Sequence, residues 1–426
     1  MPPEKPHWVN LLGEVVRSGL CTGCAACVIA CPHDVLRYDD REGPYRPWKV
    51  DEDGGAEDCT HGQRGCTLCT RACPRFRSWE VEADTFMYGR PRNVDEVYGV
   101  SQEIVLARAT DDKVRSLGQD GGAVSAMLIW ALDHSMIDCA LVSSTRGDKS
   151  SFDGMSDGAR QSTSEDLQGD NSGMVGETSA SDMSGEQSSG LGAVRPVPAF
   201  VTDRQGVLNA SGSRYTYSTN TLAYFDAVGA GFEKIAIVGT GCQASIPAVM
   251  NARKAGKVGR RLVLSIGLLC SKTFDETMYE ELFEAGYGIG RDSIAKVNIK
   301  GRFQVWMQDG SYAEVPLKEG RKWTREGCKL CPDFAAEHAD VSAGGIGELA
   351  GWTILIIRTE AGKQLVDGAH GDGAIEIRPV TEDPSVIDLL VKLSRASRKR
   401  WPQDGSTYHE PGILPEPVVG QTSVVS

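Results

Sequence analysis

Cysteine is the residue type whose spacing in this sequence points most directly to chemistry. The chain of 426 residues contains 13 cysteines, and eight of them lie within the first 73 positions. The first four form the run Cys21-x2-Cys24-x2-Cys27-x3-Cys31, which is followed by Pro32. In such a run three closely spaced thiolates bind one [4Fe–4S] cube and the fourth thiolate binds a second cube. The spacing therefore predicts iron–sulfur chemistry near the N-terminus.

A second run of four cysteines follows the first. It reads Cys59-x6-Cys66-x2-Cys69-x3-Cys73 before Pro74, so it keeps the later spacings and lengthens the first gap from two residues to six. Because the fourth cysteine of each run binds the cluster of the other run, we expect two mixed ligand sets. The two sets are Cys21, Cys24, Cys27 and Cys73 for one cube, and Cys59, Cys66, Cys69 and Cys31 for the other.

Zinc binding is the alternative interpretation of these cysteines, because Cys-x2-Cys pairs also bind zinc tetrahedrally. A zinc site needs four ligands in two pairs, and it does not explain two four-cysteine runs that each end in Cys-Pro. We therefore predict a ferredoxin-type domain with two [4Fe–4S] clusters over residues 1–92. Such a domain, fused to another, serves as an electron relay.

Composition and charge exclude several other classes of protein. The 45 Lys and Arg residues against 58 Asp and Glu residues give a net charge of −13, which argues against nucleic acid as a partner. No apolar run is long enough for a transmembrane segment, and the first residues lack the pattern of a signal peptide. Cysteines without a secretion signal favour metal or redox roles, so we expect a reducing, cytoplasmic location.

The hydrophobic pattern predicts an α/β domain over residues 93–400. An apolar helix is expected over 123–134 and a buried strand over 139–142. From residue 221 helices and strands alternate, and a hairpin is expected over 304–316, around Asp309-Gly310.

Two segments have a composition that argues against a packed fold. Residues 151–190 contain 10 Ser, 7 Gly and 8 Asp or Glu, too few apolar side chains to offset the entropy of ordering the chain. We predict a disordered acidic insertion there, which interrupts one domain and does not separate two. A tail is expected over 401–426.

Four of the remaining cysteines follow strands or stand in a further pair. Cys242 and Cys270 each come directly after an expected strand, where open α/β sheets place their ligands, and Cys328-x2-Cys331 could close over them. The four thiols could hold a third [4Fe–4S] cluster. Alternatively, Cys242 and Cys270 are small buried side chains and the pair binds zinc or nothing. Cys139, in a strand, is expected to be a core residue.

Two glycine-rich turns could receive a phosphate group. The turn 119–122 precedes the helix expected at 123, whose free amides and positive end could face a pyrophosphate. The segment 342–347, after a strand expected at 339–341, offers a second such loop. Neither is a GxGxxG fingerprint, and each could be an ordinary turn.

Together these motifs resemble the beta-subunit family of coenzyme F420-reducing hydrogenases and F420-linked dehydrogenases. The resemblance spans roughly residues 95–360 in seven motifs that follow the family's order. They are Gly121-Gly-Ala-Val-Ser-Ala-Met-Leu-Ile-Trp-Ala-Leu132 with Met136-Ile-Asp138, Gly212-Ser-Arg-Tyr215, Gly239-Thr-Gly-Cys-Gln243, Gly267-Leu-Leu-Cys270, Cys328-Lys-Leu-Cys-Pro-Asp-Phe334, Ala339-Asp-Val-Ser-Ala-Gly344 and Gly351-Trp-Thr353. The chain departs from the family at Gly241, where members usually have proline, in the stretch after Gln243, and in its long acidic insertion.

The resemblance implies a subunit that carries FAD, a third [4Fe–4S] cluster and a site where coenzyme F420 stacks on the flavin. The implied ligands of that cluster are Cys242, Cys270, Cys328 and Cys331. The residues that we expect to contact FAD or F420 are Gln119, Gly121, Gly122, Ser213, Arg214, Tyr215, Gly344 and Gly345.

With its N-terminal two-cluster domain, the chain resembles the electron-input subunits of F420H2 dehydrogenases. The implied function is electron transfer between F420, a hydride carrier, and one-electron carriers. Partners would be a ferredoxin or other subunits of a hydrogenase- or dehydrogenase-type complex, which could place the chain at the periphery of a membrane complex. Two alternatives stay open: a reductase of the same family that ferredoxin feeds and that acts on another substrate, and a relay subunit without flavin.

Overall fold

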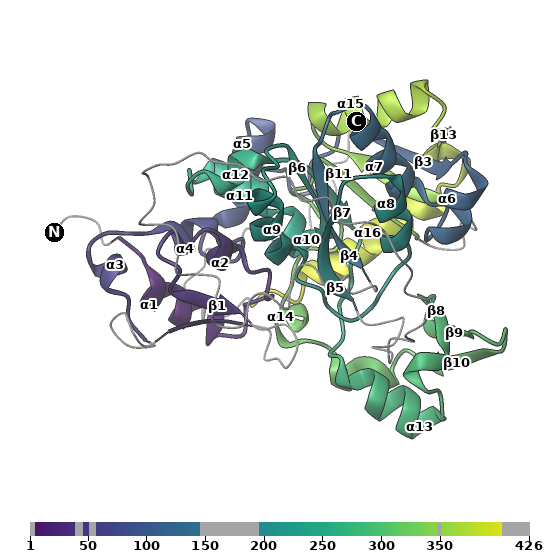
Figure 1. Cartoon of the computed structure of the whole chain (residues 1–426), viewed down its shortest axis with the longest axis horizontal. Coiled ribbons are helices and arrows are strands. Elements are labelled where there is room, and N and C mark those ends of the chain that lie inside the picture. The colour runs from purple at the N-terminus through teal and green to yellow at the C-terminus, as the bar shows by residue number, and fades with distance from the viewer. Residues whose placement is uncertain (1–4, 39–45, 51–56, 145–195, 347–350, 403–426) are drawn as a thin grey trace, which may run out of the picture.

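The computed structural model of the chain describes residues 5–38, 46–50, 57–144, 196–346 and 351–402. The predicted insertion at 151–190 and the predicted tail beyond residue 402 lie outside these ranges. An N-terminal part packs beside a larger α/β part, and a small three-stranded sheet projects from the larger part (Figure 1). No helix in the described ranges is both long enough and apolar enough to cross a membrane.

Short elements around the two cysteine runs make up the N-terminal part. They are α1 Trp8–Leu11, the π-helix η1 Leu12–Val16, α2 Ala26–Ile29, β1 Leu36–Tyr38, β2 Pro47–Lys49, α3 Thr60–Gln63, α4 Leu68–Ala72 and α5 Trp79–Tyr88. Strands β1 and β2 pair antiparallel. Trp8, Leu11 and Phe76 belong to its apolar core, and Trp401 packs into the same core. Trp401 is the first residue of the predicted tail 401–426. Since it is packed into this core, the folded part of the chain extends at least one residue beyond the predicted domain end at residue 400.

An eight-stranded mixed sheet forms the centre of the larger part, with the order β13-β3-β12-β11-β7-β6-β4-β5. Its strands are β3 Glu103–Ala109, β4 Cys139–Ser144, β5 Val197–Val201, β6 Ile235–Thr240, β7 Leu262–Leu268, β11 Val341–Gly344, β12 Thr353–Ile357 and β13 Ile375–Pro379. The four strands β11, β7, β6 and β4 run parallel, whereas the outer pairs are antiparallel. This mixed architecture confirms the predicted α/β fold class.

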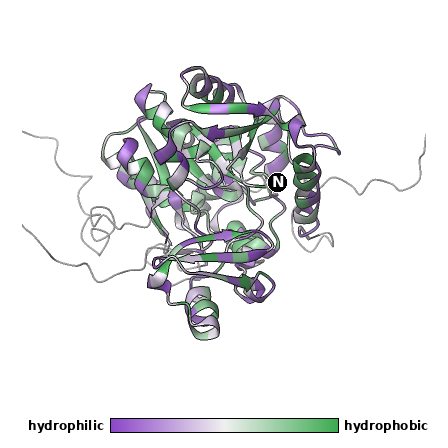
Figure 2. Ribbon diagram, turned by 90° about the vertical axis from the view of Figure 1, so that its right-hand side faces the viewer, coloured by the Kyte–Doolittle hydropathy of each residue, from purple (hydrophilic) through white to green (hydrophobic). Residues whose placement is uncertain are grey.

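Helices cover both faces of the sheet, because side chains alternate between the faces along each strand. In β4, Ala140 and Val142 face one core, while Cys139 and Leu141 face the other. Cys139 is fully buried, which confirms the expectation that it is a core residue. The strands contain many hydrophobic residues, whereas the helices carry both hydrophobic and hydrophilic residues (Figure 2). The helical segments are α6 Asp112–Leu117, α7 Ala123–Asp133, α8 Arg204–Ala210, the 3-10 helix η2 Asn220–Ala223, α9 Tyr224–Gly229, α10 Gly241–Ala244, α11 Ile246–Ala252, α12 Val258–Arg261, α15 Glu360–Gly371, the 3-10 helix η6 Val380–Glu382 and α16 Ser385–Arg398.

The small sheet confirms the predicted hairpin and adds a third strand to it. Its strands are β8 Ile294–Ile299, β9 Arg302–Met307 and β10 Tyr312–Pro316. The accompanying helices are the π-helix η3 Tyr279–Glu284, α13 Ala285–Tyr287, the 3-10 helices η4 Arg291–Ser293 and η5 Glu319–Trp323, and α14 Glu326–Lys329. Aromatic side chains, among them Phe274, Phe283 and Phe303, form a separate core under this sheet.

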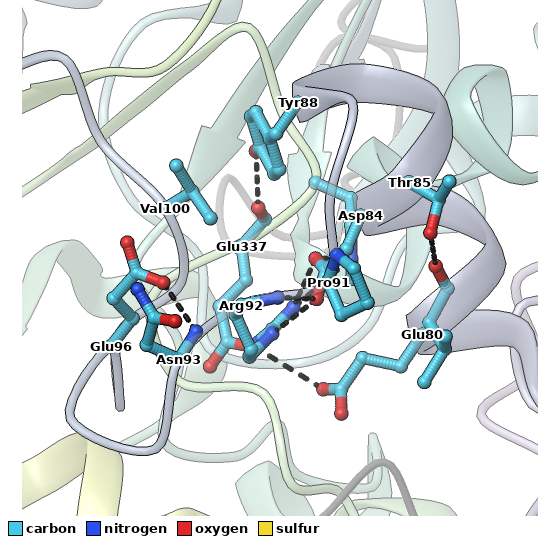
Figure 3. A network of polar contacts seen from close by, with 12 residues as sticks. Glu80, Asp84, Thr85, Tyr88, Pro91, Arg92, Asn93, Glu96, Val100 and Glu337 are labelled. Atoms are coloured by element: carbon cyan, nitrogen blue, oxygen red, sulfur yellow. Dashed lines mark hydrogen bonds and ion pairs between the residues drawn. The ribbon is translucent and has the colours of Figure 1, made fainter.

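A buried ion network joins α5 to the larger part (Figure 3). Arg92 donates to both carboxylate oxygens of Asp84, at 2.7 and 2.8 Å, and also pairs with Glu337. Arg398 of α16 donates to Glu80 at 3.0 Å and pairs with the same Glu337. All five side chains are at most 5% exposed. The network therefore ties the last helix of the N-terminal part to the C-terminal helix through charged side chains that are almost fully buried.

Arg92→Ala should destabilise the fold, because it leaves the carboxylates of Glu80, Asp84 and Glu337 buried without their shared cation. Breaking a buried pair in this way costs about 3–5 kcal/mol, to be measured by denaturant unfolding under anaerobic conditions. The control is Arg302→Ala, which removes an exposed pair and should cost less than about 1 kcal/mol. A loss of less than about 1 kcal/mol in Arg92→Ala as well would show that the network does not hold the parts together.

Candidate functional site

Twelve of the 13 cysteines gather into three sets of four. The first set is Cys21, Cys24, Cys27 and Cys73, the second set is Cys31, Cys59, Cys66 and Cys69, and the third set is Cys242, Cys270, Cys328 and Cys331. Within each set burial raises the pKa of thiols such as Cys27 and Cys270, and the charges of neighbouring thiolates raise it further. The fourth cysteine of each N-terminal run thus lies with the other run, which is the grouping expected from the spacing.

The parallel strands β6 and β7 position half of the third set. They are neighbours in the sheet, so their carboxyl ends meet at one edge, as expected. Cys242 follows β6 in the first turn of α10, and Cys270 follows β7, where its amide donates to the carbonyl of Phe334 at 2.9 Å. Cys328 lies in α14, which packs so closely on the first set that a Cβ at Gly327 would overlap the Cys21 carbonyl oxygen.

Hydroxyl groups surround the sulfur atoms of the third set. Thr240 Oγ1 lies 3.2 Å from Cys242 Sγ, and Tyr217 Oη lies 3.6 Å from the same sulfur. Thr273 Oγ1 lies 3.4 Å from Cys328 Sγ. Hydrogen bonds to a thiolate favour its charged form, and they are the contacts through which a protein tunes a bound metal.

Two buried arginines that the sequence analysis does not single out lie beside the third set. Burial opposes the charge of Arg75, yet the thiolates of Cys331 and Cys242 raise its pKa above the ordinary value. Burial likewise opposes the charge of Arg325, and Cys328 raises its pKa. The sequence places Arg75 just after the second cysteine run, but its contact with a cysteine 256 positions away depends on the fold.

The three sets lie in series. Besides burial, the charge of Cys242 in the third set raises the pKa of Cys21 and Cys24 in the first set. Cys27 of the first set in turn has Cys69 of the second set among its charged neighbours. The first set therefore lies between the other two, and the second and third sets each contain three partly exposed cysteines.

A single metal ion and a [4Fe–4S] cube require different spacings of their four thiolates. No group of three or more His, Cys, Asp or Glu side chains in the described ranges converges closely enough to hold a single metal ion. Tetrahedral zinc with Zn–S bonds of about 2.3 Å brings its sulfurs within about 3.8 Å of one another. A [4Fe–4S] cube, which binds a thiolate at each of four iron atoms, holds the sulfurs farther apart. All 13 cysteines are free thiols.

A polar pocket of about 220 Å³ lies between the large and the small sheet. Its wall includes the turn 118–121 before α7, Arg115, and Lys296, Asn298, Lys300 and Trp306 from the small sheet. Gln119 donates to Asn298 Oδ1 at 3.0 Å, while its buried Oε1 has no partner among the described residues. The three cations Arg115, Lys296 and Lys300 suit an anionic ligand, whereas the Gln119 oxygen would accept a hydrogen bond from a donor such as a hydroxyl of that ligand. The contribution of the small sheet could not be seen in the sequence, because it depends on how the two sheets meet.

Tyr215 lies between this pocket and the third set. Its hydroxyl donates to Asn298 Oδ1 of the pocket wall at 3.2 Å. Burial raises the pKa of Tyr215, and Asp120 on the pocket side and Cys270 of the third set raise it further. The Tyr215 side chain is therefore close to both, which puts the pocket next to the third set.

The neighbouring residues Ser213 and Arg214 do not line the pocket as the structure describes it. Ser213 is exposed. Arg214 Nη1 donates to the carbonyls of Ala210, Ser211 and Gly212 at 2.9, 2.9 and 2.7 Å. This arginine closes the end of α8, because the last carbonyls of a helix need donors.

The second glycine segment differs from the predicted loop. Strand β11 covers Val341–Gly344 rather than 339–341, so Gly344 pairs within the sheet. A Cβ at Gly344 would lie 2.8 Å from the Leu269 side chain, and one at Gly345 would overlap the carboxylate of Asp120. Glycine at position 345 allows the segment 342–347 to pack closely against the turn 119–122.

The first glycine segment also has a structural reason for its glycines. Gly121 and Gly122 have φ of +96° and +70°, and a Cβ at Gly122 would lie 2.7 Å from the Val114 carbonyl oxygen. Gly122 is the N-cap of α7, but the pocket wall in the described structure ends at Gly121. The turn before the helix, rather than the helix end, faces the pocket.

Gly122→Val should therefore destabilise the fold whether or not a cofactor binds. A β-branched residue at this φ, against a backbone oxygen, costs at least about 1–3 kcal/mol, to be measured as the free energy of unfolding of the cofactor-free chain. Gly229→Val is the matched control, because no atom lies within 4 Å of its Cβ position. Equal stability of the two variants would contradict this account of Gly122.

Known families and proteins match most of the chain. The model for the C terminus of the coenzyme F420 hydrogenase/dehydrogenase beta subunit matches residues 232–383, and the model for the N-terminal part of the same protein matches 104–163. A 4Fe-4S dicluster domain matches 20–76.

The beta subunit of the coenzyme F420 hydrogenase of Methanothermobacter thermautotrophicus is 30% identical over 330 residues, which cover 75% of this chain and 99% of that protein. The F subunit of the F420H2 dehydrogenase of Methanosarcina mazei is 26% identical over 404 residues, covering 94% of this chain and 93% of that protein. A chain of the F420-reducing [NiFe] hydrogenase complex from Methanosarcina barkeri superposes with a TM-score of 0.58 and 25% identity, over 72% of this chain and 91% of that one. With its N-terminal dicluster domain, this chain belongs to the coenzyme F420 hydrogenase/dehydrogenase beta-subunit family of oxidoreductases.

Proposed function

We propose that the chain transfers electrons between coenzyme F420 and one-electron carriers through FAD and three [4Fe–4S] clusters, as part of a larger oxidoreductase complex. The observation that carries the proposal is the series that starts at the cationic pocket, passes Tyr215 and continues through the third, first and second cysteine sets. An electron path needs redox centres that lie close to one another, whereas metal sites with a purely structural role need no such proximity.

The donor chemistry of the three sets fits [4Fe–4S] clusters. Each set offers four thiols. Burial and neighbouring thiolates raise the pKa of Cys69 in the second set, and burial raises that of Cys331 in the third. Four such thiols become stable as thiolates only when a metal supplies positive charge. We assign one cluster to each of the first, second and third sets.

The pocket fits the phosphate-bearing part of FAD or of F420. Its volume of about 220 Å³ is below the roughly 300–1,000 Å³ of a pocket for a whole ligand of drug size. Arg115, Lys296 and Lys300 would pair with phosphate oxygens, and Trp306 offers an apolar face. When bound, a flavin exchanges a hydride with F420 and single electrons with iron–sulfur clusters, which links the two kinds of carrier.

The chain's own residues position these groups. Tyr215, held by Asn298 of the pocket wall, would link the pocket to the neighbourhood of Cys270. The second set is the end of the series that lies away from the pocket, so a partner would dock there. Since the relatives named above are subunits of F420 hydrogenase or dehydrogenase, we infer that the partner is another subunit of such a complex or a ferredoxin. Free thiols throughout support a cytoplasmic location.

The cluster assignment predicts about 12 irons per chain purified anaerobically, four for each cube. Cys24→Ala, Cys66→Ala and Cys328→Ala should each lose about four irons, because each removes a ligand from a different set. Cys139→Ala is the matched control: its thiol is buried in β4 outside all three sets, and its iron content should not change. Iron and acid-labile sulfide analysis decides the outcome, and full iron in all three ligand variants would contradict the assignment.

The pocket assignment predicts that the double variant Lys296→Ala/Lys300→Ala binds its anionic ligand at least roughly tenfold more weakly, because charge-assisted contacts are lost. The flavin-to-protein ratio tests FAD, and the KM for F420H2 in anaerobic oxidation with an artificial one-electron acceptor tests F420. Lys318→Ala, an exposed lysine of the same small sheet region, is the control. If neither the flavin ratio nor the KM changed, the pocket would not be the cofactor site.

A further inference from the structure

Arg75 touches two of the three cysteine sets. Its backbone amide hydrogen-bonds the Cys73 thiol of the first set, and its Nη2 donates to Cys331 Sγ of the third set at 3.3 Å. Nη1 donates to the Pro74 carbonyl at 2.5 Å, and the guanidinium lies 4.6 Å from the centre of the Trp79 ring. The residue is 1% exposed, so its position is fixed from all sides.

The charge of Arg75 is balanced by sulfur. Its side-chain donors go to the Pro74 carbonyl and to Cys331 Sγ, and no ion pair with a carboxylate is found among the described residues, although a buried cation without a partner is costly. The thiolates of Cys331 and Cys242 are instead the strongest charges that raise its pKa against the effect of burial, and Asp333 comes after them. The buried cation is therefore placed to interact with whatever negative charge the third set carries.

We propose that Arg75 is a positioning residue that raises the reduction potential of the third-set cluster and fixes that cluster relative to the first. The inference rests on the proposed function, because it assumes clusters in both sets. A guanidinium beside a cluster ligand stabilises the state that carries one more electron, and an N–H···S hydrogen bond acts in the same direction. Arg75 thereby favours transfer of an electron from the pocket to the third-set cluster. Its backbone contact with Cys73 keeps the first-set cluster at a constant distance from the third-set cluster.

The test is a redox titration of the complete, anaerobically purified chain, followed by electron paramagnetic resonance. Arg75→Gln removes the charge, and Arg75→Met does so while keeping the volume against Trp79. In either variant one of the three potentials should become more negative by at least about 59 mV, a tenfold change in the equilibrium constant of a one-electron couple. Arg75→Lys, which keeps the charge, should recover part of the shift. Arg302→Gln, an exposed arginine of β9, should leave all three potentials unchanged.

Three unchanged potentials in an iron-replete Arg75→Gln or Arg75→Met would overturn the inference. Loss of the third cluster from both variants would also overturn it, because Arg75 would then serve only to hold the structure together. These outcomes are distinct from failure of the proposed function. A wild-type chain with clearly fewer than about 12 irons, or without a third cluster signal, would defeat the cluster assignment itself before any variant is compared.

Discussion

The free-energy cost of ionising four neighbouring thiols away from bulk water is the constraint on which the arrangement of this molecule depends. Burial and neighbouring cysteines raise the pKa of thiols such as Cys27 and Cys270, so thiolates in each set require positive charge nearby. The protein places cations and hydroxyl groups beside the third set. Arg75 and Arg325 supply the positive charge, and threonine hydroxyls contact the sulfur atoms of Cys242 and Cys328. Such groups must be held rigidly, because a buried charge that moves away from its partner becomes costly.

Rigid placement comes from joining two parts of the chain over a long stretch of contact. Helix α14 packs on the first set at Gly327, and the ion network of Arg92 and Arg398 ties α5 to α16. The N-terminal part is thus fixed to the sheet on two sides of the cysteine series. Electron transfer depends steeply on separation, so a flexible tether between the parts would not serve the proposed path, whereas this buried junction does.

The sequence predicted the features that depend on local spacing. Two ligand runs, the strands before Cys242 and Cys270, and the hairpin at 304–316 follow from residue types over a few positions. Features that depend on the meeting of distant segments were missed. Arg75 reaches Cys331 only through the fold, and Lys296 and Lys300 enter the pocket wall because the small sheet turns toward Gly121. Arg214 donates to the carbonyls of Ala210, Ser211 and Gly212, and the motif does not reveal these contacts.

The central claim is that F420 chemistry at the pocket feeds the cysteine series, and rapid mixing tests it most directly. Protein replete in iron and flavin is mixed anaerobically with F420H2 in the absence of any acceptor, and the visible absorbance is followed. The account predicts that F420H2 is oxidised while the flavin absorbance and then the cluster absorbance bleach. A protein with full iron and flavin whose absorbance bleaches with reduced ferredoxin but stays unchanged with F420H2 would contradict it.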